Sequence, residues 1–419
     1  MHIIGQPQII KAYIDPGTGS MLFTVLIGLI SALVYGLRSL FIKLKYSIGL
    51  KNKGVSNDSM PFVIYSEGSR YFNVFYSICE EFEKRKITLN YLTQSKDDPI
   101  FDQHFSYVKP EFIGSGNSGF AKLNLLKANV LLSTTPGLDV YQWKKSRDVK
   151  HYIHIPHMPN DITTYRMFGL DYYDAVLVSG EYQVEQLKKL EAIRNIKKKE
   201  IQVVGLTYLD SLYSRYQKEK NNIKTNNITV LLAPSWGKSS IFSKYGGRII
   251  DNLLKTGFDI IIRPHPQSYI SEKEMLDDLM NQYPEQEHLK WNRDIDNFNV
   301  LNTSDILISD FSGVIFDFSL VFDKPIIYAD TSFDYSPYDA WWLKEPLWTF
   351  DVLPKIGNKL DDENIDSIKE LIESTLKDKE LKKGRTEARK ETWANKGESA
   401  KLIADYMIEK EKEYNKEEQ

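Results

Sequence analysis

The segment FDIIIRPHPQS (258–268) places an arginine and a histidine where they could hold phosphate oxygens. Its apolar half predicts a strand that ends near Arg263 and His265, and the prolines on either side restrict the backbone there. A guanidinium offers phosphate a planar fork of donors, and a histidine adds a donor that titrates near neutrality. The pair suits a diphosphate, although both side chains could instead make structural hydrogen bonds.

A second polar cluster follows the predicted strand 306–308 and consists of Ser309, Asp310, Ser312 and Gly313. A helical pattern begins directly after this cluster. Free backbone amides at a helix start, together with the serine hydroxyls, form an anion site that needs no lysine. Asp310 and Ser312 could equally be helix N-caps. Asp317 falls about one turn into the helix, where it could accept hydrogen bonds from a ribose or a polyol.

Three of the seven histidines lie within HYIHIPHMPND, namely His151, His154 and His157. Zinc binding fits this segment poorly, because HExxH is absent and Cys79 lies far upstream. A general base fits better, since histidine can take a proton from an attacking hydroxyl. Pro156 should turn the chain, so that His157 lies beyond the strand end while His154 stays inside the strand. No carboxylate cluster resembles a two-metal site, and we therefore predict no metal.

The composition restricts the classes of protein to consider. A chain of 419 residues suffices for two or three domains, and 42% apolar residues exclude global disorder. The net charge of -3 provides no basic field of the kind that nucleic-acid binders use, so no nucleic-acid partner is predicted. Cys79, the single cysteine, permits no internal disulfide, which fits a reducing cytoplasm.

Short apolar runs alternate with helical patterns along most of the chain and predict buried parallel strands. The first series comprises residues 61–68, 87–95, 129–137, 151–157, 173–180 and 201–205. The second series comprises residues 228–236, 258–266, 306–313 and 324–330. This βαβ signature predicts an α/β protein with two Rossmann-like domains whose strand ends face a shared cleft.

The boundaries of these domains follow from composition. The polar stretch 217–227 is typical of a linker, so we place the first Rossmann-like domain at 61–220 and the second at 228–395. A C-terminal helix and charged tail occupy 396–419, and residues 410–419 are expected to be solvated or frayed. The aromatic segment 335–348 fits a packed surface loop better than an aromatic lip of the cleft.

The N-terminal region contains an apolar run without charge at 20–37, whose apolar character continues to Leu44. This run is long enough to cross a bilayer as a tilted helix. A cleaved signal peptide is the rival, but here the positive charge follows the run and no cleavage site stands out. The basic residues that follow are Arg38, Lys43, Lys45, Lys51 and Lys53.

By the positive-inside rule, these cations place the long C-terminal part in the cytoplasm. We therefore expect a single-pass protein of the cell membrane, with residues 1–19 outside, a transmembrane helix and basic flank at 20–44, and a linker at 45–60. The basic flank is a topology signal and could also rest on anionic headgroups.

The ordered set APSWGKSS (233–240), RPHP (263–266) and SDFSGVIFDF followed by DKPIIY resembles the catalytic domain of the CDP-glycerol glycerophosphotransferases. These are the teichoic acid primases and polymerases of bacteria. The PHM segment with Arg166 and Gly169 is similar to the acceptor region of the same family. The final NKGESAKLIADYMI is similar to its closing helix. The resemblance covers the chain from about Val63 to Ile408 and implies the GT-B arrangement of two Rossmann-like domains, an acceptor domain at 61–220 and a nucleotide-donor domain at 228–395.

The resemblance implies transfer of a polyol phosphate, most simply glycerol phosphate, from a CDP-polyol to a hydroxyl of a lipid-linked or polymeric acceptor, with release of CMP. His157 would be the base, with His154 as the alternative, and His265 would assist the leaving phosphate. The residues implied in substrate binding are Arg166, Ser235, Arg263, Ser309, Asp310, Ser312, Gly313 and Asp317. The CDP-polyol is a donor substrate, and no separate cofactor is implied.

Two departures from the family pattern keep other functions open. Family members usually show His-Gly-x-Pro at the first histidine and two serines in the later loop, whereas this chain has HIPHMP and Ser312-Gly313. One alternative is a nucleotide-sugar glycosyltransferase or an epimerase of the same fold. Another is an inactive, membrane-tethered relative that binds a nucleotide as a scaffold.

Overall fold

The computed structural model describes residues 25–37, 40, 59–219, 227–294, 296–329 and 331–417. The chain divides into two units, Met1–Asp58 and Ser59–Gln419. In the first unit, residues 25–37 are helical and expose apolar side chains such as Leu29 and Leu33. Across the described residues, no helix combines the length and the apolar character that a membrane crossing requires. The rest of the predicted span, and nearly all of the segments 1–19 and 45–60, lie outside the described residues.

A parallel sheet forms what we call the N-terminal lobe of the second unit, with the strand order β3-β2-β1-β4-β5-β6-β7. The strands are β1 (Met60–Ser66), β2 (Leu89–Thr93), β3 (Val108–Phe112), β4 (Ala128–Ser133), β5 (Val149–His154), β6 (Ala175–Val178) and β7 (Glu200–Val203). The chain runs outward from β1 to β3 and then returns to β4 on the other side of β1. Such a reversal is where doubly wound folds bind ligands, at the carboxyl ends of the strands.

A second parallel sheet forms the C-terminal lobe, with the strand order β10-β9-β8-β11-β12-β13. Its strands are β8 (Thr229–Leu232), β9 (Asp259–Ile262), β10 (Leu289–Trp291), β11 (Ile306–Ser309), β12 (Ile326–Ala329) and β13 (Gly357–Leu360). The same reversal occurs here between β8 and β11. The prediction of an α/β fold with two parallel sheets is therefore confirmed.

Each predicted apolar run overlaps a strand, whereas three strands among the described residues were not predicted. These three, β3, β10 and β13, are all at sheet edges. An edge strand has a neighbour on one side only and can remain partly exposed, as the three exposed residues of β3 show. Pro110 within β3 is tolerated for the same reason. The apolar signal that marks central strands is therefore absent from these segments.

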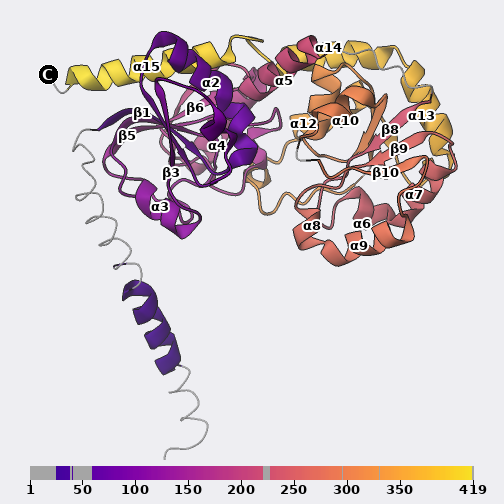
Figure 1. The fold of residues 1–419 in the computed structure, drawn as a ribbon, viewed down its shortest axis with the longest axis horizontal. Helices are drawn as coiled ribbons and strands as arrows, with labels where there is room; N and C mark the ends of the chain where they lie inside the picture. The colour runs from indigo at the N-terminus through magenta and orange to yellow at the C-terminus, as the bar shows by residue number, and fades with distance from the viewer. Residues whose placement is uncertain are drawn as a thin grey trace, which may run out of the picture. The chain divides into compact units, whose positions relative to one another are not determined.

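Helices cover the faces of both sheets (Figure 1). They are α2 (Phe72–Arg85), α3 (Asn117–Leu123), α4 (Glu181–Arg194), α5 (Thr207–Lys218), α6 (Ile241–Tyr245), α7 (Gly247–Leu254), α8 (Ser268–Ser271), α9 (Lys273–Gln282), α10 (Phe298–Thr303), α11 (Val314–Phe316), α12 (Trp348–Ile356), α13 (Ile368–Lys377), α14 (Glu380–Thr392) and α15 (Ser399–Glu417). Helix α5 contacts α2 of the N-terminal lobe and residues 317–321 of the C-terminal lobe. The predicted linker 217–227 begins within α5, and residues 220–226 lie outside the described part.

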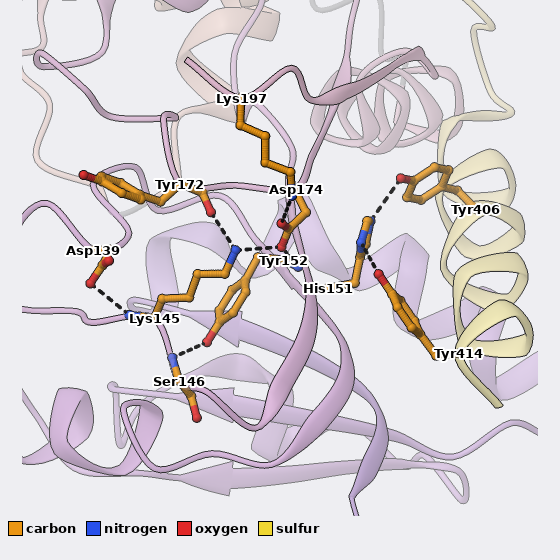
Figure 2. A network of polar contacts seen from close by, with 10 residues as sticks. All are labelled: Asp139, Lys145, Ser146, His151, Tyr152, Tyr172, Asp174, Lys197, Tyr406 and Tyr414. Atoms are coloured by element: carbon orange, nitrogen blue, oxygen red, sulfur yellow. Dashed lines mark hydrogen bonds and ion pairs between the residues drawn. The ribbon is translucent and has the colours of Figure 1, made fainter. Parts of the chain in front are cut away.

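The charged C-terminus corrects part of one expectation, because residues 410–417 are helical instead of frayed, although Lys412, Glu413, Asn415 and Lys416 are exposed to solvent. Helix α15 continues to Glu417 and packs on α2 and β4 of the N-terminal lobe (Figure 1). Figure 2 shows the buried His151 of β5 between two tyrosines of this helix, with Tyr406 Oη 3.1 Å from Nε2 and Tyr414 Oη 3.1 Å from Nδ1. Lys410 adds an ion pair to Glu200 at 2.8 Å. These tertiary contacts hold a segment that has little apolar character of its own.

Candidate active site

The base candidates come from the segment that leaves β5. His154 is the last residue of that strand and is fully buried, with its Nε2 3.1 Å from the Tyr165 hydroxyl. Burial lowers the pKa of His154 well below its usual value, since the protonated ring would lose its hydration. The strand ends at this residue, and Pro156 and His157 lie beyond it. His154 is thus enclosed in the N-terminal lobe.

His157 is half-buried, in contrast to His154. Its Nδ1 lies 3.1 Å from Thr134 Oγ1, at the end of β4, and its ring packs edge-on at 5.2 Å against Tyr71. Burial, and then the positive charge of Arg70, lower the pKa of His157 to about 4. The ring is therefore neutral at neutral pH. When Nδ1 donates its proton to Thr134, Nε2 presents the lone pair that a general base needs.

In the C-terminal lobe, Arg263 and His265 follow β9 directly. Arg263 donates to the side-chain oxygen of Asn292, which orients the half-buried guanidinium, and burial lowers its pKa. The backbone amide of Gln267 donates to His265 Nδ1 at 3.1 Å. In the neutral ring the proton must then be on Nε2, so this atom is a hydrogen-bond donor. Both side chains therefore offer donors that suit phosphate oxygens.

The polar cluster after β11 has a buried part, Ser309 and Asp310, and a half-buried part, Ser312 and Gly313. Asp310 is buried, and its carboxylate accepts hydrogen bonds from the backbone amides of Ser235 at 3.0 Å and Ile241 at 3.1 Å. The buried hydroxyl of Ser309 donates to the carbonyl of Ala233 at 2.6 Å. Asp310 and Ser309 thus tie the loop after β8 to the end of β11. These contacts position the backbone around Ser235.

Ser312 and Gly313 are the half-buried part of this cluster. The helix after them is short, since α11 passes into a π-helical segment (Asp317–Val321) after Phe316. Asp317 is buried within this segment and accepts a hydrogen bond from Tyr208 of α5 at 3.0 Å. Burial raises the pKa of Asp317 to about 7. Through the hydrogen bond from Tyr208, the Asp317 carboxylate contacts α5, the helix that packs on both lobes.

The two lobes meet at Gly313. A Cβ atom at this position would lie 3.3 Å from Met158 Sδ and 3.5 Å from Asn160 Oδ1. Met158 directly follows the histidine that we predict to be the base, and Gly313 belongs to the predicted diphosphate loop. Two segments that are about 150 residues apart in the sequence are therefore neighbours in space.

Arg166 is exposed and pairs through its backbone with Tyr338 of the C-terminal lobe in an antiparallel bridge. The adjacent amide of Met167 donates to the Pro337 carbonyl at 3.2 Å. Asp339, which is buried, accepts from Arg194 Nη1 at 2.6 Å. The aromatic segment 335–348 is thus packed against the N-terminal lobe in its first part.

No group of three or more His, Cys, Asp or Glu side chains in the described residues is arranged to hold a metal ion. The site consists instead of histidines, arginines, hydroxyl groups and backbone amides. This set suits phosphoryl transfer to an oxygen nucleophile, in which positioning, proton removal and electrostatic stabilisation carry the reaction.

A protein-family model identifies the class of enzyme. The model described as "CDP-Glycerol:Poly(glycerophosphate) glycerophosphotransferase" matches residues 120–409, which is more than half of the chain. The chain belongs to this family. The match includes the segments around His157, Arg263 and Ser312, and it confirms the family that the sequence motifs indicated. The reaction class of the family is the transfer of glycerophosphate.

Solved structures agree with this glycerophosphotransferase fold. The wall teichoic acid polymerase TagF, as a histidine-to-asparagine variant soaked with CDPG, is 16% identical with a TM-score of 0.56, and the match covers 91% of this chain and 98% of that chain. The UDP-GlcNAc 2-epimerase of Methanocaldococcus jannaschii, in complex with UDP-GlcNAc and UDP, is 15% identical with a TM-score of 0.55, covering 83% and 99%. At this identity the likeness shows the fold alone. No curated protein sequence matches the chain.

Sequence reasoning missed Asp161, which in this member of the family connects the lobes. Asp161 is buried in the N-terminal lobe, yet its carboxylate caps α12 of the C-terminal lobe, accepting from the amides of Trp348 and Thr349 at 2.8 Å each. The Thr349 hydroxyl adds a hydrogen bond of 2.6 Å. An N-cap is recognised in a sequence by its position just before the helix. A cap supplied by a distant residue gives no such signal.

We expect Asp161→Ala to lower the free energy of unfolding by about 2 to 4 kcal/mol, because it removes a helix cap and leaves buried amides without an acceptor. Asp161→Asn retains one acceptor oxygen and should lose less. Urea unfolding of the purified chain, with the exposed Asp362→Ala as the control, measures the difference. If Asp161→Ala unfolded at the same urea concentration as the control, the contact between the lobes would not contribute to stability.

Proposed function

We propose that this chain transfers glycerol phosphate from CDP-glycerol to a hydroxyl of a lipid-linked or polymeric acceptor during synthesis of a teichoic-acid-like surface polymer. The contact of Gly313 with Met158 and Asn160 carries this proposal. In a member of this family, it brings the segment of the predicted base next to the loop predicted to hold the diphosphate. The CDPG soaked into TagF supports a CDP-polyol as the donor.

In the proposed reaction the acceptor hydroxyl attacks the phosphorus that carries the glycerol. His157 removes the hydroxyl proton as the new oxygen–phosphorus bond forms. The bond from this phosphorus to the oxygen shared with the cytidine phosphate breaks, and its electron pair leaves on that oxygen as CMP. Arg263 and the Nε2 proton of His265 stabilise the charge that develops there.

The residues around β8 and β11 have two roles in this proposal. The backbone amides at Ser312 and Gly313 face the diphosphate, together with the Ser235 loop. Ser309 and Asp310, whose polar atoms are engaged with that loop, position it instead of contacting the substrate. Asp317 is buried within the C-terminal lobe and has a positioning role, because its carboxylate accepts the hydrogen bond from Tyr208.

A turnover assay of the purified, detergent-solubilised protein against CDP-polyols and UDP-sugars tests the function. Release of CMP from CDP-glycerol, in the presence of a glycerophosphate-primed acceptor, is the expected result. Release of UDP from a UDP-sugar would instead support a glycosyltransferase or an epimerase. Nucleotide binding without any product would support an inactive scaffold. CDP-ribitol in the same panel distinguishes the polyol.

We also propose that the catalytic unit faces the cytoplasm from a membrane anchor at residues 20–44. The uncharged run and the five cations after it support this topology. A reporter that works in the cytoplasm should therefore be active when it is fused after Gln419. A reporter that works only after export should be inactive at the same position. Paired fusions to a cytoplasmic and an exported reporter provide the measurement. Activity of the exported reporter would reverse the proposed topology. A protein that could be washed from the membrane completely without detergent would contradict the anchor.

A further inference from the structure

Arg70 lies at the reversal of the strand order in the N-terminal lobe, in the turn Ser69–Tyr71 that follows β1. The guanidinium stacks on the neighbouring Tyr71, with Cζ 4.8 Å from the ring centre. Tyr71 also packs edge-on against the ring of His157, with the ring centres 5.2 Å apart. A positive charge is therefore separated from the predicted base by a single aromatic ring, at the strand ends where this fold binds its ligands.

The Arg70 guanidinium can accept an anion without breaking a strong contact. Its side chain is 69% exposed, and Nη2 lies 3.8 Å from Glu67 Oε2, which is longer than a hydrogen bond. Exposed ion pairs of this kind contribute little to stability. A phosphate group could thus take up the donors of Arg70 at low cost, and a guanidinium matches phosphate oxygens in its geometry.

The charge of Arg70 also reaches both lobes. Burial is the main cause of the lowered pKa of His157 in the N-terminal lobe and of His265 in the C-terminal lobe, and the positive charge of Arg70 adds to the lowering of each. In the proposed reaction His157 acts on the attacking oxygen and His265 on the leaving oxygen. The phosphorus that is transferred must lie between those two oxygens. Arg70, which stacks on Tyr71 next to the His157 ring, therefore lies at the end of that path where the acceptor oxygen attacks.

We propose that Arg70 is a further catalytic residue, which binds the nonbridging oxygens of the phosphoryl group in transfer. This inference rests on the proposed function. While the acceptor oxygen bonds to the phosphorus and the bond to CMP breaks, the guanidinium stabilises the negative charge on those oxygens and keeps its own protons. The acceptor proton still goes to His157, and the electron pair of the broken bond still leaves with CMP.

Kinetics of Arg70→Ala and Arg70→Lys test this role. We expect Arg70→Ala to lower kcat by about 100-fold or more, with a KM for CDP-glycerol that changes only a few-fold. Arg70→Lys should retain part of the rate, and added guanidinium ion should restore part of the rate of Arg70→Ala. Arg147→Ala removes an exposed arginine from the opposite end of β5 and should behave as wild type. If Arg70→Ala raised the KM for the acceptor and left kcat unchanged, the proposal would be overturned, and Arg70 would be a residue that binds the acceptor.

The pH dependence of kcat/KM distinguishes a catalytic role of Arg70 from a structural one, because a purely structural role would leave the pH profile unchanged. The groups facing His157 are Arg70 and Tyr71 from the turn, His154 from β5, and Tyr165. Removing the positive charge of Arg70 should raise the pKa of His157. The acidic limb of kcat/KM should then move to higher pH in Arg70→Ala. An unmoved limb together with a wild-type kcat would refute a catalytic role.

A binding measurement separates this inference from the proposed transferase activity. Orthovanadate with CMP mimics a five-coordinate phosphoryl group, and its affinity does not require turnover. We expect wild type to bind this pair, and Arg70→Ala to bind it at least about tenfold more weakly. If wild type released no CMP from any donor but showed this difference, the function would fail and the Arg70 anion site would stand. Equal vanadate affinity in both proteins would overturn the Arg70 site alone.

Discussion

Replacing His157 with alanine should abolish CMP release while leaving the fold and the affinity for CDP-glycerol nearly intact. The ring of His157 is half-buried and lies just beyond the end of β5. Its pKa of about 4 keeps it neutral at neutral pH. Loss of a general base slows a reaction by about 10²- to 10⁴-fold. In the wild type, activity should fall as the pH drops through about 4, because the base becomes protonated. Initial rates of CMP release from acidic to neutral pH provide the measurement.

His154→Ala is the matched control, since this histidine lies three positions earlier in the same segment. It is fully buried and bonded to Tyr165, so its loss should lower the thermal midpoint more than the rate. Donor affinity, thermal midpoint and CMP release are compared for both variants. If His154→Ala alone stopped turnover in a folded protein, His154 would be the base. If neither lost more than a few-fold, base catalysis from this segment would be wrong.

The second large effect is expected at the strand end of β9. Arg263→Ala and His265→Ala should each slow CMP release by more than about 100-fold, the scale of losing a charge-stabilising or acid-base group. The oriented guanidinium of Arg263 and the Nε2 donor of His265 both serve the leaving phosphate in this mechanism. Rapid-quench measurement of CMP at saturating CDP-glycerol separates the chemical step from binding.

His288→Ala provides the control for this pair. His288 is an exposed histidine of the same lobe, and its Nδ1 contacts the Asp259 carboxylate at 2.8 Å. Its removal should leave the rate of CMP release unchanged. Asn292→Ala, which frees Arg263 to move, should fall between the control and Arg263→Ala. Near-normal turnover in both Arg263→Ala and His265→Ala would make the RPHP segment purely structural.

The amino-acid sequence by itself determined the central strands and the motifs that follow them. Strands such as β4 and β8 are buried along their whole length, so most of their residues are apolar and the run is visible without any structure. The motifs with Arg263 and Ser312 come directly after such runs. Since parallel strands bring their carboxyl ends to one edge, the position of each motif within its own lobe followed from the chain order.

The tertiary structure alone decided which residues of the two lobes meet. Asp161 caps a helix far along the chain, and Gly313 lies against Met158, because loops of one lobe pack against the other lobe. Arg70 follows an ordinary strand and carries no motif, so only its distance to Tyr71 and His157 reveals it. Local sequence patterns report short-range periodicity and capping. They hold no information on contacts that form through docking, and for this reason the catalytic geometry had to come from the folded chain.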